Sequence, residues 1–415
     1  MKILIYGINF APDLVGIPKY TSEMTAWLTE RGHEVRVVTA HPYYPAWRVP
    51  EGYRAGRYKR ERWSLGGGAQ ADVWRCPLWV PAQPSGARRL VHLASFAASS
   101  LPVVLSQALW RPHLIFVVEP TLFCTPAALM AGLLGRAKAW LHIQDLEVDA
   151  AFEMGLLPGG RVRDVATAVE RWLLRRFGRV STISEAMRDR VLAKSVSPER
   201  VGLFPNWVDV DSIVPMAQPS GFREELGLAP GTRVALYAGN LGEKQGLELL
   251  VDAARGLRHR SDVVFVIAGS GSGRQRLEGL ADGMPNVKFL PLQPLNRLND
   301  LLNLADVHLL PQRADAADLV MPSKLTGMVA SGRPVVATAA PETQVAKVVA
   351  RCGLVVAPGD GDAFTQAIMT LLDDRERREA LGAEARAYAE ANLAQESIMA
   401  RFEAEAEQLA GLGSS

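Results

Sequence analysis

The chain has 415 residues, of which 48% are hydrophobic and 22% are charged, and its formal net charge is +2. This length exceeds what one hydrophobic core usually serves, and the composition is that of an ordinary soluble protein, so we predict two α/β domains. The three cysteines, Cys76, Cys124 and Cys352, lie far apart in the sequence, which excludes a disulfide framework or a cysteine metal site and fits a reducing compartment.

The charge is divided unevenly along the chain. Residues 1–205 hold 26 Lys and Arg against 17 Asp and Glu, a net charge of +9, whereas residues 206–415 hold 20 against 27, a net charge of −7. The basic first half favours contact with an anionic partner.

The first 40 residues predict a strand, a helix and a second strand. KILIYG and HEVRVVTA are β-branched runs, and KYTSEMTAWLTERG between them has a helical pattern that ends at Gly32. The apolar run at the start is too short for a signal peptide, so we expect a cytoplasmic protein. In the loop after the first strand, Gly16 precedes Pro18, a residue suited to the first turn of a helix, so the free N–H groups of that turn can bind an anion. The alternative is an ordinary tight turn.

Two segments of the first half suggest contact with a membrane. The loop WRVPEGYRAGRYKRERW, residues 47–63, mixes six basic residues with four aromatic ones, as loops that contact anionic lipid headgroups do. No nucleic-acid-binding motif accompanies it, so we expect no nucleic acid, and a solvated surface loop is the alternative. Residues 90–110 form an uncharged stretch of 21 residues. Three interpretations are open for this stretch: a helix within the domain, a helix lying on a membrane, or a membrane span. Its serines and Pro102 disfavour the span.

The strand pattern continues to residue 205 and then restarts. HLIFVVE, AWLHIQ and RVSTIS complete the first set, and a segment rich in proline and turn residues, FPNWVDVDSIVPMAQPSG, follows. VALYAGN, DVVFVIAG, NVKFL, DVHLLP and PVVAT, each followed by a helical pattern, form the second set. We predict two doubly wound, Rossmann-like domains with parallel sheets, residues 1–205 and 206–394, with the helical tail 395–412 completing the first.

Such domains bind ligands outside the carboxyl ends of their strands, so we expect a site in a cleft between the two domains. Three features of the second domain point there: AGNLGEKQG after its first strand, AGSGSG after its second, and MPSK at the start of a helix. Glycines let the backbone approach a phosphate, and Lys244, Lys324 and the helix start supply positive charge, so we predict a diphosphate site. The sequence shows no cluster of metal ligands, and no GxGxxG loop of the dehydrogenase type follows the first strand.

The order of these segments resembles that of the family-four glycosyltransferases of the GT-B fold over nearly the whole chain. The motifs that carry the resemblance are MKILIYGINFAPDLVGIPKYTSEMTAWLTERGHEVRVVT, HIQDLE, VSTISEAM, FPNWVD, YAGNLGEKQGLELL, VIAGSGSG, NVKFLP, ADVHLLP and ASGRPVVA. GNLGEKQG and PSKLTGMVASGRPVVAT are most similar to the branch that builds bacterial exopolysaccharides, especially its colanic acid fucosyltransferase-like members.

The resemblance implies a retaining, metal-independent transfer of a hexosyl or deoxyhexosyl group, such as fucosyl, from a nucleotide sugar. The nucleotide is expected on the second domain, with GDP and UDP both open, and the acceptor on the first. Together with the basic first half, it suggests a polyprenyl-diphosphate-linked saccharide as acceptor and a first domain that rests on the anionic inner face of the cell membrane.

The resemblance also assigns donor-binding positions. They are Gly16 at the distal phosphate, and Gly239, Asn240, Gln245 and Gly269 in the two glycine loops. Asn240 and Gln245 stand where most relatives carry an arginine and a lysine, and the adjacent Lys244 is the expected substitute for that lysine.

Two glutamates of the family pattern are displaced in this chain. The usual ribose-binding position falls on Gly327 and the usual sugar-binding position on Asp315, at a longer spacing than in relatives. We expect Asp315 or Asp318 to hold the sugar hydroxyls and leave the ribose contact unassigned. Ser323 and Lys324 are the expected compensation, because they place hydrogen-bond donors and charge at the phosphates. The alternative is a solvated helix cap.

On the acceptor side, HIQDLEVDA places Gln144 and Asp145 where relatives often carry a His-Asp pair. In a retaining transfer the departing phosphate oxygen can accept the acceptor's proton, so Asp145 need only orient the hydroxyl. The expected catalytic residues are thus Asp145, Lys324 and Lys244, and helix capping is the alternative for Asp145.

Two other functions stay open on the sequence alone. A sugar-nucleotide 2-epimerase shares the fold but needs a buried acid/base set that the sequence does not reveal. An inactive binding partner would explain why both customary glutamates are displaced.

Overall fold

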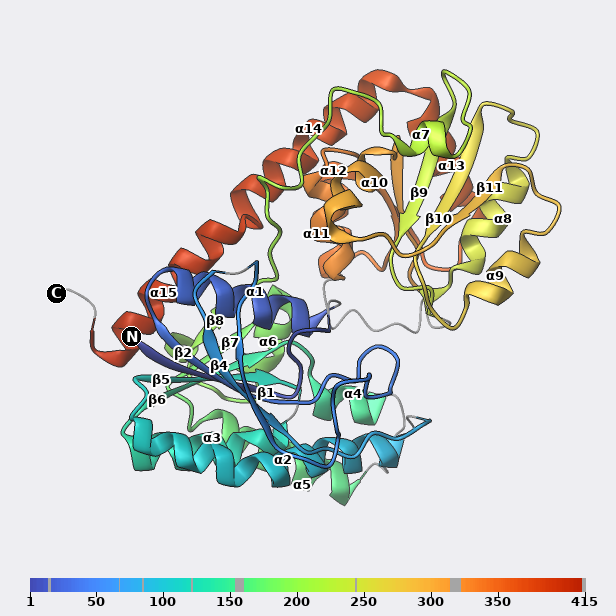
Figure 1. Ribbon diagram of the computed structural model, residues 1–415. Helices are drawn as coiled ribbons and strands as arrows, with labels where there is room; N and C mark the ends of the chain where they lie inside the picture. Colours follow the sequence, from blue (N-terminus) through green and yellow to red (C-terminus); the bar gives the residue numbers. More distant parts are fainter. Residues whose placement is uncertain are drawn as a thin grey trace. The chain divides into compact units, whose positions relative to one another are not determined.

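The computed structural model describes residues 1–13, 16–66, 68–83, 86–120, 122–153, 160–242, 245–313 and 322–412. The chain divides into two compact units (Figure 1). The first comprises Met1–Pro205 and Met399–Ser415, and the second comprises Asn206–Ile398.

Within the described residues, the first unit holds a sheet of eight strands in the order β3-β4-β2-β1-β5-β6-β7-β8. The strands are β1 (Lys2–Gly7), β2 (Glu34–Ala40), β3 (Lys59–Trp63), β4 (Ala71–Cys76), β5 (Leu114–Glu119), β6 (Lys138–Ile143), β7 (Arg179–Thr182) and β8 (Val201–Leu203). All neighbours pair in parallel except β3, which runs antiparallel to β4. The prediction of an all-parallel sheet is therefore wrong at this edge. The end of the predicted loop 47–63 forms a strand there, and its charged side chains suit an edge.

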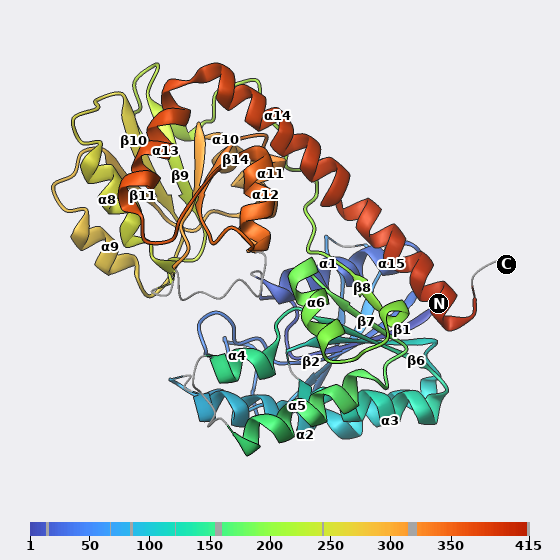
Figure 2. The ribbon, with the colours of Figure 1, turned by 180° about the vertical axis from the view of Figure 1, so that it is seen from behind.

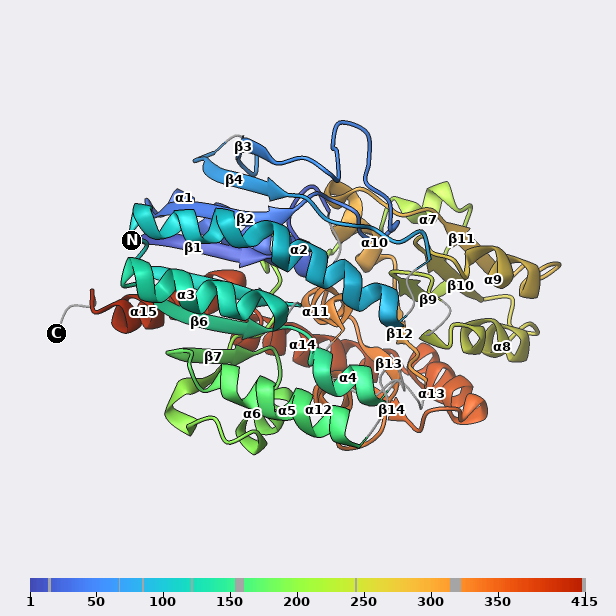
Figure 3. The same cartoon turned by 90° about the horizontal axis from the view of Figure 1, so that it is seen from below.

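Helices cover both faces of the first sheet (Figures 1 and 2). They are α1 (Ile17–Glu30), α2 (Gly86–Gln107), α3 (Thr125–Gly135), α4 (Glu147–Glu153), α5 (Arg161–Leu174) and α6 (Glu185–Ala193). Helices α2, α3 and α5 lie together on one face, whereas α1 and α15 (Gln395–Ala410) lie on the other (Figures 1 and 3).

The uncharged segment 90–110 belongs to α2 and the short helix that follows it, Ala108–Trp110, and α2 packs on the first sheet. Its inner side packs on the sheet, where Phe96 is buried and Ser100 Oγ lies 2.6 Å from Tyr6 Oη. Among the described residues, Gly86–Trp110 is the one helix whose length and composition would suffice to cross a membrane. Length and composition alone are weak evidence for a span.

The C-terminal helix completes the core of the first unit. Phe402, on α15, is buried among three aromatic rings, with centroids 5.1 Å from Phe116, 4.9 Å from Trp140 and 5.1 Å from Phe204. The end of the chain is thus built into the same core as strands β5 and β6.

The second unit is a parallel sheet of six strands, among the described residues, in the order β11-β10-β9-β12-β13-β14. The strands are β9 (Arg233–Ala238), β10 (Val263–Ala268), β11 (Val287–Leu290), β12 (Val307–Leu310), β13 (Val335–Thr338) and β14 (Gly353–Val356). The helices are α7 (Phe222–Glu225), α8 (Glu248–Gly256), α9 (Arg274–Leu280), α10 (Leu298–Asn303), α11 (Ser323–Ala330), α12 (Gln344–Cys352), α13 (Gly361–Asp373) and α14 (Arg375–Asn392).

Each sheet has one point where the strand order reverses, between β1 and β5 in the first unit and between β9 and β12 in the second. Ligands of doubly wound folds bind outside the carboxyl ends of the strands at this point. We therefore expect residues after β1, β5, β9 and β12 to be part of the ligand site.

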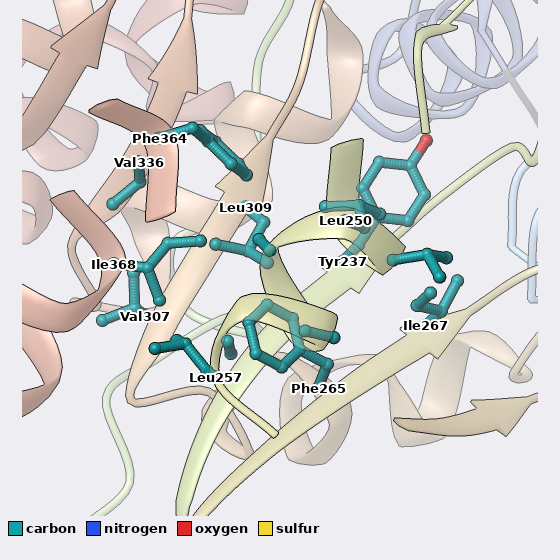
Figure 4. Packing of buried hydrophobic residues seen from close by; sticks show 14 of the residues in the cluster. Tyr237, Leu250, Leu257, Phe265, Ile267, Val307, Leu309, Val336, Phe364 and Ile368 are labelled. Carbon is teal, nitrogen blue, oxygen red and sulfur yellow. The ribbon is translucent and has the colours of Figure 1, made fainter. Parts of the chain in front are cut away.

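The core under the second sheet carries one polar group to its edge. Figure 4 shows Tyr237 packed beside Leu250 and Ile267, with its hydroxyl oxygen pointing away from the apolar cluster. A buried tyrosine hydroxyl needs a hydrogen-bond partner, so its surroundings are the natural start for a search for the site.

Candidate functional site

Two glycine loops meet at the carboxyl ends of β9 and β10. Gly239 N donates a hydrogen bond to Ala268 O over 2.9 Å, and Leu241 N donates to Ser270 O over 2.8 Å. A Cβ on Gly269 would lie 1.9 Å from Gly239 O, and the φ of Gly269 is +144°. Only glycine fits this position, because a side chain would collide with backbone that cannot give way.

Lys324 reaches into this junction from the start of α11. Its Nζ donates hydrogen bonds of 2.8 Å to Tyr237 Oη and of 2.8 Å to Gln245 Oε1. The ammonium also lies 4.6 Å from the centroid of the Tyr237 ring. Tyr237 Oη in turn donates to Asn240 O over 2.8 Å, which ties the lysine to the first glycine loop. Two of the predicted donor-binding positions are thus joined to Lys324, Asn240 through the tyrosine hydroxyl and Gln245 through its own amide oxygen.

The charge of Lys324 is poorly compensated. Burial lowers the pKa of Lys324 to about 7, and no carboxylate of the described chain forms an ion pair with it. A desolvated ammonium without a counter-charge favours the binding of an anion, because the anion restores the interaction that water has lost.

The start of α11 adds backbone donors beside this lysine. The helix begins at Ser323 after Pro322, no side chain caps it, and its first turn contains no acidic residue. Open N–H groups at a helix start, together with the positive end of the helix dipole, form a ready anion site. The alternative role of Ser323 as a helix cap is not supported, because Pro322 occupies the N-cap position and no side chain makes a capping hydrogen bond.

Three of the predicted residues lie outside the described part of the chain: Lys244, Asp315 and Asp318. Gly327 is described, and a Cβ there would lie 3.2 Å from Leu302 Cδ1. The position of the family's ribose-binding glutamate therefore faces an apolar side chain here.

Sequence reasoning missed Arg313 beside the first glycine loop. A Cβ on Gly246, whose φ is +66°, would lie only 2.9 Å from Arg313 Cγ. Arg313 follows β12, at the point where the strand order reverses, and a basic residue just past the end of a buried strand was the available signal.

In the first unit, Gly16 lies at the start of a helix. Its φ is +74°, it immediately precedes α1, and no side chain caps that helix. A Cβ at this position would meet no described atom within 4 Å. Uncapped N–H groups at a helix start of this kind can bind an anion.

Gln144 and Asp145 follow β6, as predicted. Gln144 is buried, and Asp145 Oδ2 lies 3.9 Å from Arg89 Nη2. Burial raises the pKa of Asp145, and the charge of Arg89 opposes that shift. Asp145 is therefore a partly desolvated carboxylate at the edge of the sheet where a ligand is expected.

Two further carboxyl groups near Asp145, one buried and one partly buried, were not predicted. Glu119, at the end of β5, is 4% exposed, its Oε1 has no hydrogen-bond partner, and burial raises its pKa well above the usual value. Burial also raises the pKa of Glu147 to about 7, and Glu147 Oε2 accepts a hydrogen bond of 2.8 Å from Leu122 N. The only sequence signal was a charged residue ending the apolar run HLIFVVE.

Within the described ranges, no three His, Cys, Asp or Glu side chains come together as a metal ion would require. The positive charge at the second unit's glycine loops comes from the protein's own side chains and backbone.

Solved structures with the same architecture are glycosyltransferases. Sucrose-phosphate synthase of Thermosynechococcus elongatus superposes with a TM-score of 0.72 at 18% identity, covering 98% of both chains. HepE of Anabaena, solved with UDP and glucose, superposes with a TM-score of 0.68 at 17% identity, covering 99% of this chain and 100% of HepE. At this identity the likeness shows the fold, which is GT-B: two Rossmann-like domains, as predicted.

Sequence comparison then shows the family. A model described as "Glycosyl transferase 4-like domain" matches residues 15–207, and one described as "Glycosyl transferases group 1" matches residues 232–374. WcaI of Escherichia coli K12, whose name assigns it to colanic acid biosynthesis as a glycosyl transferase, is 44% identical over 415 residues, covering 97% of this chain and 98% of WcaI. The GDP-mannose-dependent monoacylated alpha-(1-6)-phosphatidylinositol monomannoside mannosyltransferase of Corynebacterium glutamicum is 31% identical over 301 residues, covering 67% of this chain and 72% of that protein. The chain belongs to this glycosyltransferase family, with a 4-like domain followed by a group 1 domain.

Proposed function

We propose that the protein transfers a hexosyl or deoxyhexosyl group, with fucosyl one candidate, from a GDP- or UDP-sugar to a polyprenyl-diphosphate-linked saccharide. The transfer retains the configuration of the sugar, needs no metal and serves the synthesis of an exopolysaccharide of the colanic acid type. The name of WcaI supports the pathway, because the two chains match over nearly their whole lengths.

The main support for the proposal is the desolvated Lys324 at the first glycine loop. As the bond to the sugar breaks, negative charge grows on the departing diphosphate, and preorganised N–H groups and an ammonium stabilise it. Lys324 lies 2.8 Å from Gln245 Oε1, so it brings a positive charge to the position where relatives place a lysine on the loop itself. This arrangement replaces the customary loop cations.

On the acceptor side, Asp145 orients the attacking hydroxyl and the departing phosphate oxygen takes its proton. Gln144 lies beside it, and the open start of α1 at Gly16 offers N–H groups to the distal phosphate of the donor sugar. The basic first domain keeps the enzyme on the inner face of the cell membrane, where its acceptor lies.

One observation favours the epimerase as a second candidate. The carboxyl groups of the buried Glu119 and the partly buried Glu147, the latter with a pKa of about 7, are the kind of acid/base set that this reaction needs and that the sequence did not reveal. The family match favours the transferase, so the epimerase stands second.

A panel of donors separates these functions. The purified protein is mixed with GDP-, UDP- and dTDP-sugars, with and without a polyprenyl-diphosphate-linked saccharide, and nucleoside diphosphate release is measured. Acceptor-dependent release with retained anomeric configuration by NMR, unchanged by EDTA, supports the proposal. Interconversion of two sugar nucleotides would establish the epimerase instead, and tight binding without turnover would establish an inactive partner.

A further inference from the structure

The outer surface of α2, α3 and α5 is unusually apolar for the surface of a domain. The exposed side chains of α3 include Met130, Leu133 and Leu134, and those of α2 include Val91 and Leu101. Leu133 is 82% exposed, although most of that helix is otherwise buried. On α5, Trp172 extends the surface. We call these six exposed residues and the helices that carry them the apolar face.

These helices lie side by side on one face of the first sheet. Helices α2 and α3 pack against each other, and Figure 3 shows α2, α3 and α5 crossing the same side of the sheet. All six exposed apolar residues lie on three neighbouring helices that cover one face of the sheet, an arrangement that fits a binding surface.

The charged residues of these helices and of their ends are mostly arginines. Residues 86–111 contain three arginines, residues 122–137 one and residues 161–176 five, nine in all, against Asp164 and the buried Glu170. The Arg176 guanidinium lies 3.4 Å from the centroid of the Trp172 ring, so an aromatic ring and a cation lie together at the C-terminal end of α5. An apolar surface with aromatic and arginine side chains at its edge matches the boundary between acyl chains and anionic headgroups.

The same charges disfavour a second copy of the chain as the occupant. In a symmetric dimer this face would meet itself, which would place arginine against arginine. An anionic bilayer instead offers complementary charge and an apolar interior.

The loop at residues 47–63, for which the sequence predicted lipid contact, has fewer free aromatic side chains for that contact than its sequence suggests. Three of its four aromatic rings pack within the domain: Trp47 lies 5.5 Å from Tyr43, Tyr53 lies 5.9 Å from His41 and Trp63 lies 4.8 Å from Phe10. The loop therefore keeps mainly its basic residues for contact with headgroups.

We propose that the protein docks on anionic phospholipid bilayers through the apolar face of α2, α3 and α5, with its leucines in the acyl boundary and its arginines at the phosphates. This inference rests on the proposed lipid-linked acceptor for its purpose, and it identifies the surface that brings the enzyme to that acceptor.

The test is flotation of the full-length protein with vesicles of equal parts phosphatidylethanolamine and phosphatidylglycerol. Leu133→Glu with Leu134→Glu should weaken partitioning about 100-fold, because two exposed leucines can no longer enter the bilayer. The control exchanges two leucines of the second unit with similar exposure, Leu292 at 60% and Leu295 at 62%, for glutamate and should bind as the wild type does.

A second variant removes charge without touching apolar packing. Arg161→Ala with Arg171→Ala should weaken binding about 30-fold at low salt and have little effect on vesicles of phosphatidylcholine. Thermal unfolding and binding of UDP or GDP, measured alongside, should match the wild type in both variants.

Three results would overturn the inference. They are unchanged flotation of the leucine variant, no flotation of the wild type, or a wild-type dimer that the leucine exchange converts to a monomer. A wild type that releases nucleoside diphosphate but does not float would overturn this inference and leave the proposed transfer standing. Flotation of a wild type that turns over no donor would support the docking surface and contradict the proposed transfer.

Discussion

At the scale of single residues, both units hold a partly buried ionisable residue whose pKa is strongly shifted. Burial lowers the pKa of Lys324 to about 7 in the second unit and raises the pKa of Glu147 to about 7 in the first. Each group lies at the carboxyl edge of its sheet, where ligands of this fold bind. Strongly shifted pKa values in such places are typical of functional groups.

Replacement of Lys324 should affect turnover directly. Lys324→Ala should lower kcat at saturating donor about 100-fold, because it removes a preorganised charge from the departing diphosphate. The exposed Lys347→Ala on α12, in the same unit, is the matched control and should have the activity of the wild type. A near-normal rate for Lys324→Ala would remove this lysine from the site.

Glu147 should make the folded protein less stable as the pH rises. Its pKa is raised to about 7, so the native state holds a proton that the unfolded state releases near pH 4.5, and the free energy of unfolding falls between these values. Glu147→Gln should flatten this fall and stabilise the protein by about 1–3 kcal/mol at pH 8, with little effect at pH 4.5. Urea unfolding at both pH values measures this. Equal slopes for the two proteins would contradict it.

At the scale of elements, the sequence predicted the regular parts and only half of the site. Strands such as VVFVIA and LIFVVE can be predicted from the sequence, because buried parallel strands are continuous β-branched runs. Strand β3 was not predicted, because the sequence of an edge strand made of charged residues resembles that of a loop. The glycine loops and Lys324 followed from local sequence. The carboxyl groups of Glu119 and Glu147 did not, because desolvation depends on neighbours that are distant in the sequence.

The junction of the two glycine loops should tolerate no side chain. Gly269→Ala places a Cβ 1.9 Å from Gly239 O, so it should cost about 2–4 kcal/mol of stability and abolish nucleotide binding. The control is Gly279→Ala on α9, where a Cβ meets nothing within 4 Å and should add up to about 1 kcal/mol. Thermal unfolding with and without UDP or GDP checks both variants, and ligand-induced stabilisation of Gly269→Ala would contradict the account.

At the scale of the whole molecule, the end of the chain returns to the domain in which the chain began. Phe402, near the C-terminus, is 2% exposed and packs on rings from β5 and β6. The first domain therefore cannot be defined by a continuous range of sequence, and it needs residues from 399 onward for its core.

Loss of that aromatic ring should destabilise the first unit strongly. Phe402→Ala should cost about 3–5 kcal/mol, because the cavity it leaves lies among aromatic rings that cannot collapse fully. Phe123→Ala, at a half-exposed ring of the same unit, should change the free energy of unfolding by less than about 0.5 kcal/mol. Denaturant titration followed by tryptophan fluorescence distinguishes the two. Similar midpoints would show that α15 contributes little to the core.

The most direct test of the central claim is calorimetric titration of the wild type and Lys324→Ala with UDP and with GDP. It is run at pH 6.5 and 8.5 in buffers of different ionisation enthalpy. In the unliganded protein the pKa of Lys324 is about 7. A diphosphate bound beside Nζ should raise this pKa, because its negative charge stabilises the ammonium. The wild type should therefore take up about one proton on binding at pH 8.5 and lose about tenfold in affinity per pH unit above 7. Lys324→Ala should bind more weakly and show neither effect. Proton-neutral binding by the wild type, with an affinity that the exchange leaves unchanged, would contradict the account.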